Sequence, residues 1–326
     1  MNRLSLLIGL VILITIISFC KKEDIIYPTY TRSNGLANNF VTSIAVDPNG
    51  NIWVGMSVFM SSGSYKVIYS GGVSKFDGAK WTTYNTTNGL AGSLVSTIAI
   101  DAEGNKWFGT DSGLSKFDDV NWTTYTIKNG LAGNSIHSIA IDANRNIWIV
   151  ANGGLSEFDG TNWKTYTTSS GLANNYITYV TADAKGNIWV GTNGFGISKF
   201  DGTNWTTYNL NGYGSNYINA LTIDAKGNIW AAFTDGYGVS KFDGYIFTNY
   251  TTNNGLANNM VWTIASDKQG NIWFGTNDGV SKFDGIHWTT YNRFVNNHVS
   301  ALTIDNLENI WIGTEGDGVY ELKKKN

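Results

Sequence analysis

Seven copies of one repeat predict an all-β fold, a seven-bladed β-propeller of four-stranded antiparallel blades. Each copy contains one Asp and one Trp at a fixed spacing. The steps between successive copies of the Trp are 54, 41, 41, 41, 43 and 38 residues. A period of roughly 40 residues with several short strands is typical of propellers. The repeated residues are Asp47, Asp101, Asp142, Asp183, Asp224, Asp267 and Asp305, and Trp53, Trp107, Trp148, Trp189, Trp230, Trp273 and Trp311.

The ends of the chain predict how the ring closes. The seventh copy stops after Leu322, without the Trp-Thr-Thr-Tyr segment that ends the other copies. A similar segment, Tyr27–Tyr30, stands at the front, as far before Gly35 as Trp81–Tyr84 stands before Gly89. We therefore expect the N-terminal strand to pair into the last blade and close the ring.

Each repeat contains four runs with the chemistry of strands. The first, such as 95–100, alternates and is rich in β-branched residues, as half-buried strands are. The second is Asn-Ile-Trp-Val-Gly-Thr, the third Gly-Val-Ser-Lys-Phe-Asp and the fourth Trp-Thr-Thr-Tyr. Asp-x-x-Gly-Asn and Asp-Gly-x-x separate first from second and third from fourth, and both are tight-hairpin sequences. Pro28 suits an outermost strand, which can accept a residue without an amide hydrogen.

Two aromatic positions recur in register and predict the contacts between blades. The second-strand Trp is present in all seven copies. The fourth-strand aromatic is Trp81, Trp122, Trp163, Trp205, Phe247, Trp288 and, by the closure argument, Tyr27. Large flat side chains in register suit face-to-face packing of neighbouring blades. A tryptophan-lined binding slot is the alternative interpretation.

Composition excludes several classes of function. The formal charge is −3, with 22 Lys and Arg against 25 Asp and Glu, and no basic stripe predicts nucleic-acid binding. The three histidines, His137, His287 and His298, have no nucleophile or metal partner at a recognisable spacing. The seven turn Asp residues are explained by hairpin capping, with a ring of cation ligands as the alternative. We expect no catalytic residues, no metal and no cofactor.

The N-terminal residues precede the repeats and have the pattern of a signal peptide. Residues 1–19 have a charged start and an apolar run of signal-peptide type, and Cys20, the sole cysteine, follows directly. This arrangement resembles a bacterial lipoprotein cleavage site, although Phe19 is larger than the residue usual before the cysteine. We expect lipidation at Cys20, a tether over 20–26 and the propeller over 27–326; an uncleaved signal anchor is the alternative. Lys22-Glu23-Asp24 resembles a tag for the outer surface of the outer membrane, with the periplasmic face as the other placement.

The repeat Asn-x-x-Val-x-x-Ile-x-x-Asp-x-x-Gly-Asn-Ile-Trp-x-Gly-Thr, followed by Gly-Val-Ser-Lys-Phe-Asp-Gly, resembles the two-component regulator propeller repeat. In that family such repeats form extracytoplasmic sensory parts of hybrid sensor kinases, often for polysaccharide breakdown products. Sensor members usually carry two propellers, a β-sandwich, a membrane helix and kinase domains. This chain has one propeller and ends at Asn326. The resemblance therefore implies the recognition half of the family's role alone.

Positions that differ between copies predict a binding site on one face of the ring. The loops between fourth and first strands and those between second and third strands should share this face. The residue before the first strand varies and is often aromatic, as are two loop positions flanked by glycine. Aromatic faces beside Asn amides suit a sugar or peptide; simple tolerance of change is the alternative. The predicted ligand-binding residues are Phe40, Tyr176, Tyr217, Trp262, His298, Phe195 and Tyr237.

We therefore expect a non-enzymatic propeller of the cell envelope that binds a glycan or an envelope protein. A structural or assembly subunit of an envelope or secretion complex is the first alternative, and a lyase-type enzyme is the second. The first repeat carries roughly thirteen extra residues between Met56 and Gly71. Phe59, Met60, Tyr65 and Tyr69 are its apolar residues, and long loops on rigid scaffolds are often functional. This insert could be a lid, a partner contact or a plain extension.

Overall fold

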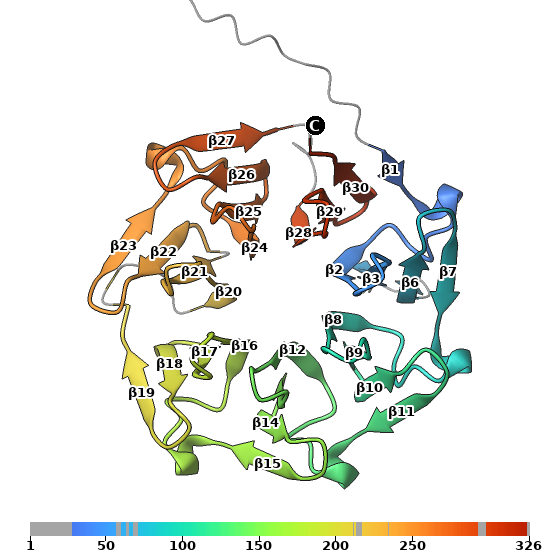
Figure 1. The fold of residues 1–326 in the computed structure, drawn as a ribbon, viewed down its shortest axis with the longest axis horizontal. Helices are drawn as coiled ribbons and strands as arrows, with labels where there is room; N and C mark the ends of the chain where they lie inside the picture. Colours follow the sequence, from blue (N-terminus) through green and yellow to red (C-terminus); the bar gives the residue numbers. More distant parts are fainter. Residues whose placement is uncertain are drawn as a thin grey trace, which may run out of the picture.

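The computed structural model describes residues 28–56, 60–62, 65–67, 71–210, 212, 217–233, 235–292 and 298–324. Seven four-stranded antiparallel sheets are arranged in a ring, as Figure 1 shows. The predicted fold class is confirmed. The signal peptide over 1–19, the tether over 20–26, Cys20 and Tyr27 all lie outside the described residues.

The blades are numbered along the chain, each with its innermost strand first. Blade 1 holds β2 (Val41–Val46), β3 (Ile52–Met56), β6 (Gly72–Phe76) and β7 (Trp81–Tyr84), and blade 2 holds β8 (Val95–Ile100), β9 (Lys106–Thr110), β10 (Leu114–Phe117) and β11 (Trp122–Tyr125). Blade 3 holds β12 (Ile136–Ile141), β13 (Ile147–Ala151), β14 (Gly154–Phe158) and β15 (Trp163–Tyr166), and blade 4 holds β16 (Ile177–Ala182), β17 (Ile188–Thr192), β18 (Gly196–Phe200) and β19 (Trp205–Tyr208). Blade 5 holds β20 (Ile218–Ile223), β21 (Ile229–Phe233), β22 (Val239–Phe242) and β23 (Phe247–Tyr250), and blade 6 holds β24 (Val261–Ser266), β25 (Ile272–Thr276), β26 (Gly279–Phe283) and β27 (Trp288–Tyr291).

Blade 7 joins the two ends of the chain, as predicted. It holds β28 (Val299–Ile304), β29 (Ile310–Thr314), β30 (Gly318–Leu322) and β1 (Thr29–Tyr30). In the pairing register, Thr29 faces Tyr320 and Tyr30 faces Val319. The carbonyl of Pro28 accepts the Glu321 amide at 3.1 Å, so the proline extends the pairing without needing an N–H.

Tryptophan fixes each blade to its own first hairpin and to the next blade. In all seven blades the indole Nε1 of the second-strand Trp donates to the turn Asp, at 2.9 to 3.1 Å. The ring itself is at most 6% exposed. Trp53 of blade 1, for example, packs with Val95 and Phe108 of blade 2. The prediction of inter-blade core is thus confirmed, and the Asp supplies the buried indole with its hydrogen-bond acceptor.

The turn Asp carboxylates are occupied by the fold. Asp183, for example, also accepts the backbone and side-chain amides of Asn187. Burial alone would raise the pKa of Asp183, but these bonds and the one from Trp189 outweigh it, so the pKa lies below its usual value of 3.8. Among the described residues no group of three His, Cys, Asp or Glu could hold a metal ion. Hairpin capping accounts for these residues.

We expect Asp183→Asn to lose about 1–2 kcal/mol of stability at pH 7, because a charged acceptor is replaced by a neutral one. The folded pKa is lowered, so the contribution of Asp183 is present above its unfolded value of 3.8 and is lost as pH falls through the folded value. Denaturant unfolding of both proteins from pH 7 to pH 2, in roughly one-unit steps, should show the difference shrinking below pH 4. A difference that stays constant would contradict this account.

The connections between blades are short and use one repeated device. Five of them contain a single 3₁₀ turn: η1 (Arg32–Asn34), η2 (Thr86–Asn88), η3 (Ile127–Asn129), η4 (Thr168–Ser170) and η5 (Thr252–Asn254). A glycine in the left-handed region, such as Gly89 at φ 119°, ends each turn. A buried third-strand serine then accepts an amide of the connection, as Ser115 Oγ does from Ala91 at 2.8 Å. No helix of the described residues is long and apolar enough to cross a bilayer.

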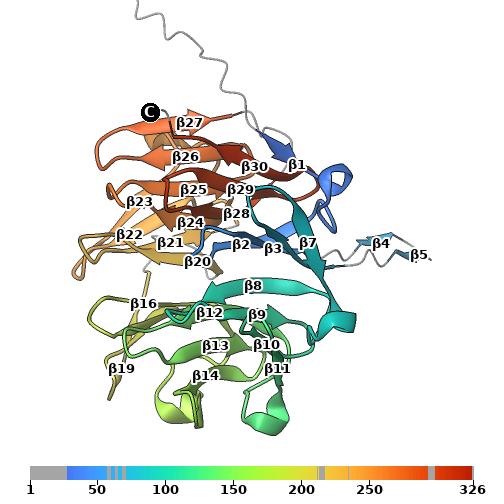
Figure 2. The same ribbon diagram turned by 45° about the vertical axis from the view of Figure 1, so that its right-hand side comes forward.

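The insert of blade 1 forms a hairpin. Its strands β4 (Met60–Ser62) and β5 (Tyr65–Val67) pair antiparallel and extend away from the ring in Figure 2. The predicted apolar side chains of Phe59, Met60, Tyr65 and Tyr69 lie outside what the structure describes.

Candidate functional site

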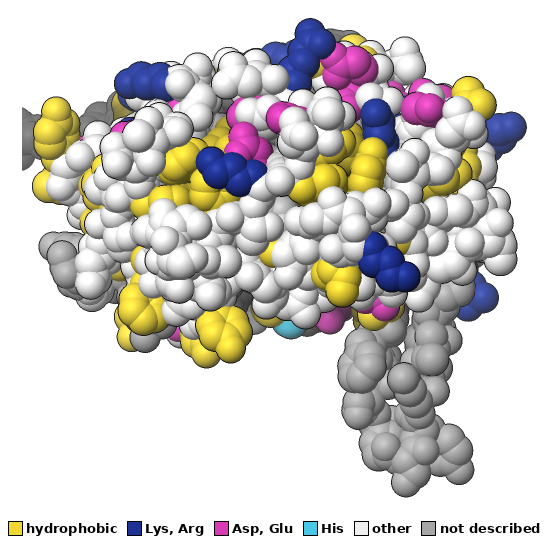
Figure 3. All heavy atoms as spheres, turned by 90° about the horizontal axis from the view of Figure 1, so that it is seen from below, with side chains coloured by type: hydrophobic (Ala, Val, Ile, Leu, Met, Phe, Trp, Pro, Cys, Tyr) yellow, Lys and Arg dark blue, Asp and Glu magenta, His cyan; other side chains and the backbone are white. Residues whose placement is uncertain are grey.

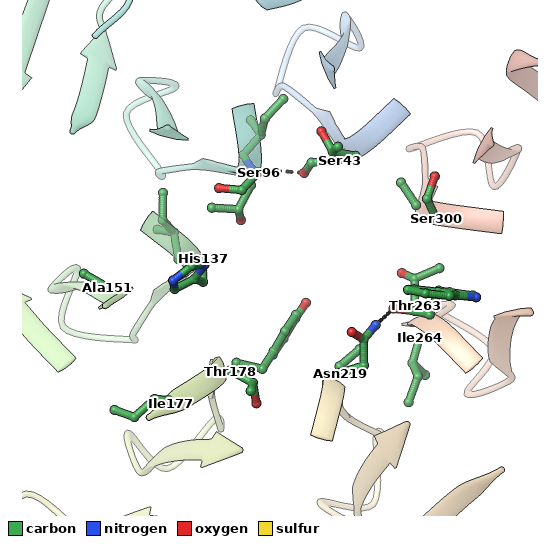
Figure 4. Close-up of a pocket in the computed structure, with 18 of the residues that line it drawn as sticks. Ser43, Ser96, His137, Ala151, Ile177, Thr178, Asn219, Thr263, Ile264 and Ser300 are labelled. Carbon is green, nitrogen blue, oxygen red and sulfur yellow. Dashed lines mark hydrogen bonds between the residues drawn. The ribbon is translucent and has the colours of Figure 1, made fainter. Parts of the chain in front are cut away.

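A repeated β-bulge aims one residue of every blade into the channel. In all seven innermost strands the pairing register shifts between the first and third residues. A bulge leaves the extra residue unpaired and redirects its side chain. Figure 4 shows the result: Ser96, His137, Thr178, Asn219 and Ser300 converge on the open centre from five strands. Thr42 and Trp262 occupy the same position in the other two blades.

The channel holds a cavity of about 570 Å³. Hydroxyl, amide, aromatic and aliphatic side chains line it, and none of the described lining residues is Asp, Glu, Lys or Arg. Four asparagines contribute amides, namely Asn152, Asn175, Asn193 and Asn219. Four aromatic or imidazole rings reach the lining, namely His137, Tyr176, Tyr179 and Trp262. A ligand inside would thus meet hydrogen-bonding groups and ring faces without a formal charge.

On one side of the channel, side-chain hydrogen bonds link neighbouring blades. The hydroxyl of Thr42 donates to the Val95 carbonyl of the next blade. Ser96 does the same to Ile136, and Ser300 to Val41, both at 2.6 Å. The hydroxyl groups of these small side chains on blades 7, 1 and 2 therefore donate to backbone carbonyls of the ring. They brace the blades and leave little for a ligand.

The opposite wall, formed by blades 3 to 6, carries larger side chains. His137 and Trp262 replace the small hydroxyl residues there, and the Asn219 amide donates to the Trp262 carbonyl at 2.5 Å. Tyr179 stands where the other blades have Ser, Thr or Ala. The chemically distinctive groups of the cavity are therefore concentrated on one side.

Trp262 is held by a network that reaches the neighbouring blade. Its indole Nε1 donates to Asn277 Oδ1 at 2.6 Å. The His298 imidazole stacks on the indole with ring centroids 4.9 Å apart and planes 17° apart. His298 in turn pairs through Nδ1 with Glu315 Oε2 at 2.7 Å. These contacts fix the orientation of the indole, so its face is positioned before any ligand arrives.

Desolvation shifts the pKa of two rings in the cavity lining, those of His137 and Tyr179. Desolvation lowers the pKa of His137 below its usual 6.5. This side chain is open to the channel space yet surrounded by the channel wall, so water reaches it without fully hydrating the imidazolium. Desolvation also raises the pKa of Tyr179. Neutral imidazole both donates and accepts a hydrogen bond, as a hydroxyl-rich ligand would require.

The structure brings together part of the predicted site. Tyr176 and Trp262 line the cavity, and His298 stacks directly on Trp262. Phe40 is half-buried and bridges to Glu315 across the blade 7–blade 1 junction. Tyr217, Phe195 and Tyr237 are 54%, 53% and 48% exposed, and none of the three lines the cavity. The residue before each first strand therefore lies mostly on the rim, because the bulge aims the second strand residue inward instead.

The two sets of loops do share a face. The backbone amides of Asp111, Asn193 and Asn277, in second-to-third loops, donate to carbonyls of the residues that precede the first strands. Figure 3 views the ring from the side: many of the charged side chains in view lie toward the upper edge, and a histidine and several hydrophobic side chains lie at the lower edge.

Sequence reasoning missed Tyr179 and the individual channel asparagines. The signal for Tyr179 was present, since six copies have a small residue at that position. Asn219 was equally visible as a departure from Ser or Thr.

Three repeats match a family model. The model described as two component regulator propeller matches residues 35–57, 171–194 and 255–278. These three segments are repeats of the two component regulator propeller type. The other four repeats share the same Asp, Trp and blade topology. No curated protein matches the chain.

Solved structures share the fold of these regulator propeller repeats. The extracellular domain of the hybrid two component system BT3049 from B. thetaiotaomicron has a TM-score of 0.76 at 24% identity, over 92% of this chain and 41% of that one. The extracellular domain of the one component system BT4673 from the same organism has a TM-score of 0.72 at 20% identity, over 92% and 42%. The chain thus spans about two-fifths of those domains. A virginiamycin B lyase from Staphylococcus aureus has a TM-score of 0.69 at 16% identity, over 88% and 96%.

Proposed function

We propose that this protein is a non-enzymatic binding propeller of the bacterial cell envelope and that its channel takes an uncharged glycan. The observation that carries the proposal is the lining of the cavity, where ring faces and amides occur without Asp, Glu, Lys or Arg among the described residues. Sugars present apolar ring faces and many hydroxyls. Aromatic stacking and amide hydrogen bonds match both features at once.

The arrangement of Trp262 supports this choice. An indole whose edge is fixed by Asn277 and whose one face is covered by His298 can offer its other face as a platform. A rigid aromatic platform loses little conformational freedom on binding. The likeness to extracellular domains of two bacterial regulatory systems supports an extracytoplasmic role, although each of those domains is more than twice as long as this chain.

The lining favours binding over catalysis. A lyase or hydrolase needs an acid and a base within reach of the substrate. His137 is the titratable imidazole in the cavity lining, and the His298–Glu315 pair lies outside that lining. The similar fold of a lyase therefore carries less weight than the residues themselves.

For the anchor, we propose lipidation at Cys20 and placement in the outer membrane, with the ring outside the cell or at the periplasmic face. Fatty-acid labelling of wild-type and Cys20→Ala protein in cells tests this. Labelling of the wild type alone, with release of the variant from membranes or a block in its processing, is the expected result. A wild-type protein without label would refute the anchor.

We expect Trp262→Ala to weaken binding of a glycan, identified on an array of neutral oligosaccharides, by about thirtyfold, as loss of a central aromatic contact does. Tyr176→Ala should weaken it too while changing stability by less than about 0.5 kcal/mol, because Tyr176 is 72% exposed. Calorimetric titration gives the affinities and thermal melting the stabilities.

The matched control is Tyr245→Ala. Tyr245 is 93% exposed but lies in a hairpin turn on the opposite face, so its loss should leave binding intact. If the control variant loses as much affinity as the channel variants, the site is misplaced. If no neutral glycan binds while a stable protein partner co-purifies, the assembly role replaces this proposal.

A further inference from the structure

The face opposite the channel mouth carries unusually exposed apolar side chains. Turns between first and second strands and between third and fourth strands lie on this face. Tyr245 is 93% exposed, Ile246 62%, Ile286 79% and Leu307 77%. The first three occupy the Asp-Gly-x-x turns of blades 5 and 6, and Leu307 lies in the first turn of blade 7. We call Tyr245, Ile246, Ile286 and Leu307 the apolar tips.

The turn sequence shows that the fold does not require apolar residues here. Blades 3 and 4 have Thr161-Asn162 and Thr203-Asn204 at the positions of Tyr245-Ile246. In both kinds of turn the preceding Asp accepts the same two backbone amides, as Asp201 and Asp243 do. Tyr245 and Ile246 thus replace polar residues without a change in turn geometry. Because Tyr245 and Ile246 have no role in the turn and are joined by Ile286 and Leu307 on neighbouring blades, we consider them as a contact with something outside the ring.

The start of the ring lies in the same sector. The strand β1 runs antiparallel to β30, so Pro28 enters blade 7 at the end where β30 finishes. Lys324 is there too, because its amide donates to Asn309 in the first turn of blade 7. Figure 1 shows β1 beside β30 and the blade of β24 to β27 next to them. The chain therefore enters on the face that bears the apolar tips.

The proposed tether is short. Seven residues separate Cys20 from Pro28, and the eight steps from one to the other span at most about 28 Å at full extension. A compact domain of this size has a radius of gyration of roughly 19 Å. A lipid on Cys20 would thus hold this rim of the ring close to the bilayer, at a distance of at most about 1.5 times the radius of gyration of the domain. The channel mouth would then lie on the side away from the bilayer.

We propose that the apolar tips of blades 5 to 7 lie on the lipid bilayer, so that the ring stands on the membrane with its channel facing away. This orientation rests on the lipid anchor proposed above, but the contact itself does not need the lipid. Aromatic and aliphatic side chains at turn tips bury in the headgroup region, and Tyr suits that boundary. Lys323 and Lys324 lie near Leu307 and pair with Glu321 and Glu308, so the contact rests on the apolar tips and not on these lysines.

The test uses the chain from Cys20 onward, which contains the whole closed ring, with Cys20→Ser so that no lipid can attach. Its binding to vesicles of phosphatidylethanolamine and phosphatidylglycerol is measured by flotation. We expect weak binding by this form and a loss of about tenfold in the triple variant Tyr245→Ser, Ile246→Ser, Ile286→Ser. Because all three residues sit at exposed turn tips, the melting temperature should not change.

Val120→Ser is the matched control. Val120 is 81% exposed in the corresponding turn of blade 2, away from the sector where the chain enters. Its replacement should leave vesicle binding unchanged. Equal losses in the control and the triple variant would show a non-specific apolar effect and overturn the proposed contact.

A second measurement uses Cys20, the only thiol, coupled to a maleimide lipid in the same vesicles. Hydrogen exchange should slow in residues 243–247 and 284–288 and stay unchanged in residues 118–121. Protection of the channel-mouth loops instead, or no vesicle binding by the ring, would overturn the orientation. Dimerisation that the triple variant abolishes, without vesicle binding, would assign the apolar tips to a second copy. An absence of fatty-acid label on Cys20 in cells would refute the anchor alone.

Discussion

Replacing Tyr30 with alanine should destabilise the ring by about 3 kcal/mol, because this one side chain joins the two ends of the chain. Tyr30 stacks on Trp311 of blade 7 at 5.7 Å and packs against Phe76 and Trp81 of blade 1 at 5.1 and 5.5 Å. Its hydroxyl donates to Glu321, 3.4 Å away. Chemical denaturation measures the loss. Deleting residues 21–34 removes β1 entirely and should cost more.

Tyr84→Ala distinguishes closure from packing. Tyr84 has the same place in blade 1 and stacks on Trp53 at 5.7 Å, but its strand is continuous with the rest of its blade. Both variants should lose stability. The Tyr30 variant alone should also speed hydrogen exchange in β30, since β1 is a two-residue strand with few bonds of its own. A Tyr30 variant that melts like the wild type would show that the ring does not depend on this closure.

The second large effect concerns an ion pair that only blade 2 has. Lys106 stands where the other six blades have Ile, and Asp119 where blades 1 and 3 to 6 have a turn Gly. Lys106 is 1% exposed and contacts Asp119, whose backbone has the left-handed φ of 77°. The ammonium lies 5.2 Å from the centre of the Trp53 ring. The two exceptions to the repeat thus compensate one another.

We expect Asp119→Gly alone to cost about 2–3 kcal/mol, because it leaves a buried ammonium without its carboxylate. The value is at the low end for buried pairs, since the Asp119 side chain is 54% exposed. The double variant Lys106→Ile, Asp119→Gly restores the pattern of the other blades and should be at least as stable as the wild type. Denaturant unfolding of the two single variants and the double variant completes the cycle.

The cycle has a clear contrary outcome. If Asp119→Gly is harmless, the ammonium finds another partner and the pair is not a unit. If the double variant is the least stable of the set, the apolar replacement fails to fill the space beside Trp53, and blade 2 has adapted its packing around the lysine.

The site was only partly predictable because a β-bulge in each innermost strand changes the direction of a side chain. Alternation along an isolated strand gives each side chain one of two faces. A bulge breaks the alternation and sends the second residue of every inner strand into the channel. Trp262 could be singled out because it is large and rare at that position. Its contact with His298, which lies 36 positions further on, belongs to a neighbouring blade and has no local signal.

The sequence by itself determined the architecture, the number of blades and the closure. These follow from a repeat in which the turn Asp, the core Trp and the strand patterns recur in register. All seven copies therefore favour the same turns and strands. Only the tertiary structure decided that the turn Asp binds the Trp indole, that Lys106 meets Asp119, and that the larger side chains of the channel gather on blades 3 to 6. Such contacts form between side chains that strand pairing and blade packing bring together. Residues far apart in the sequence meet there, so local sequence patterns do not predict the contacts.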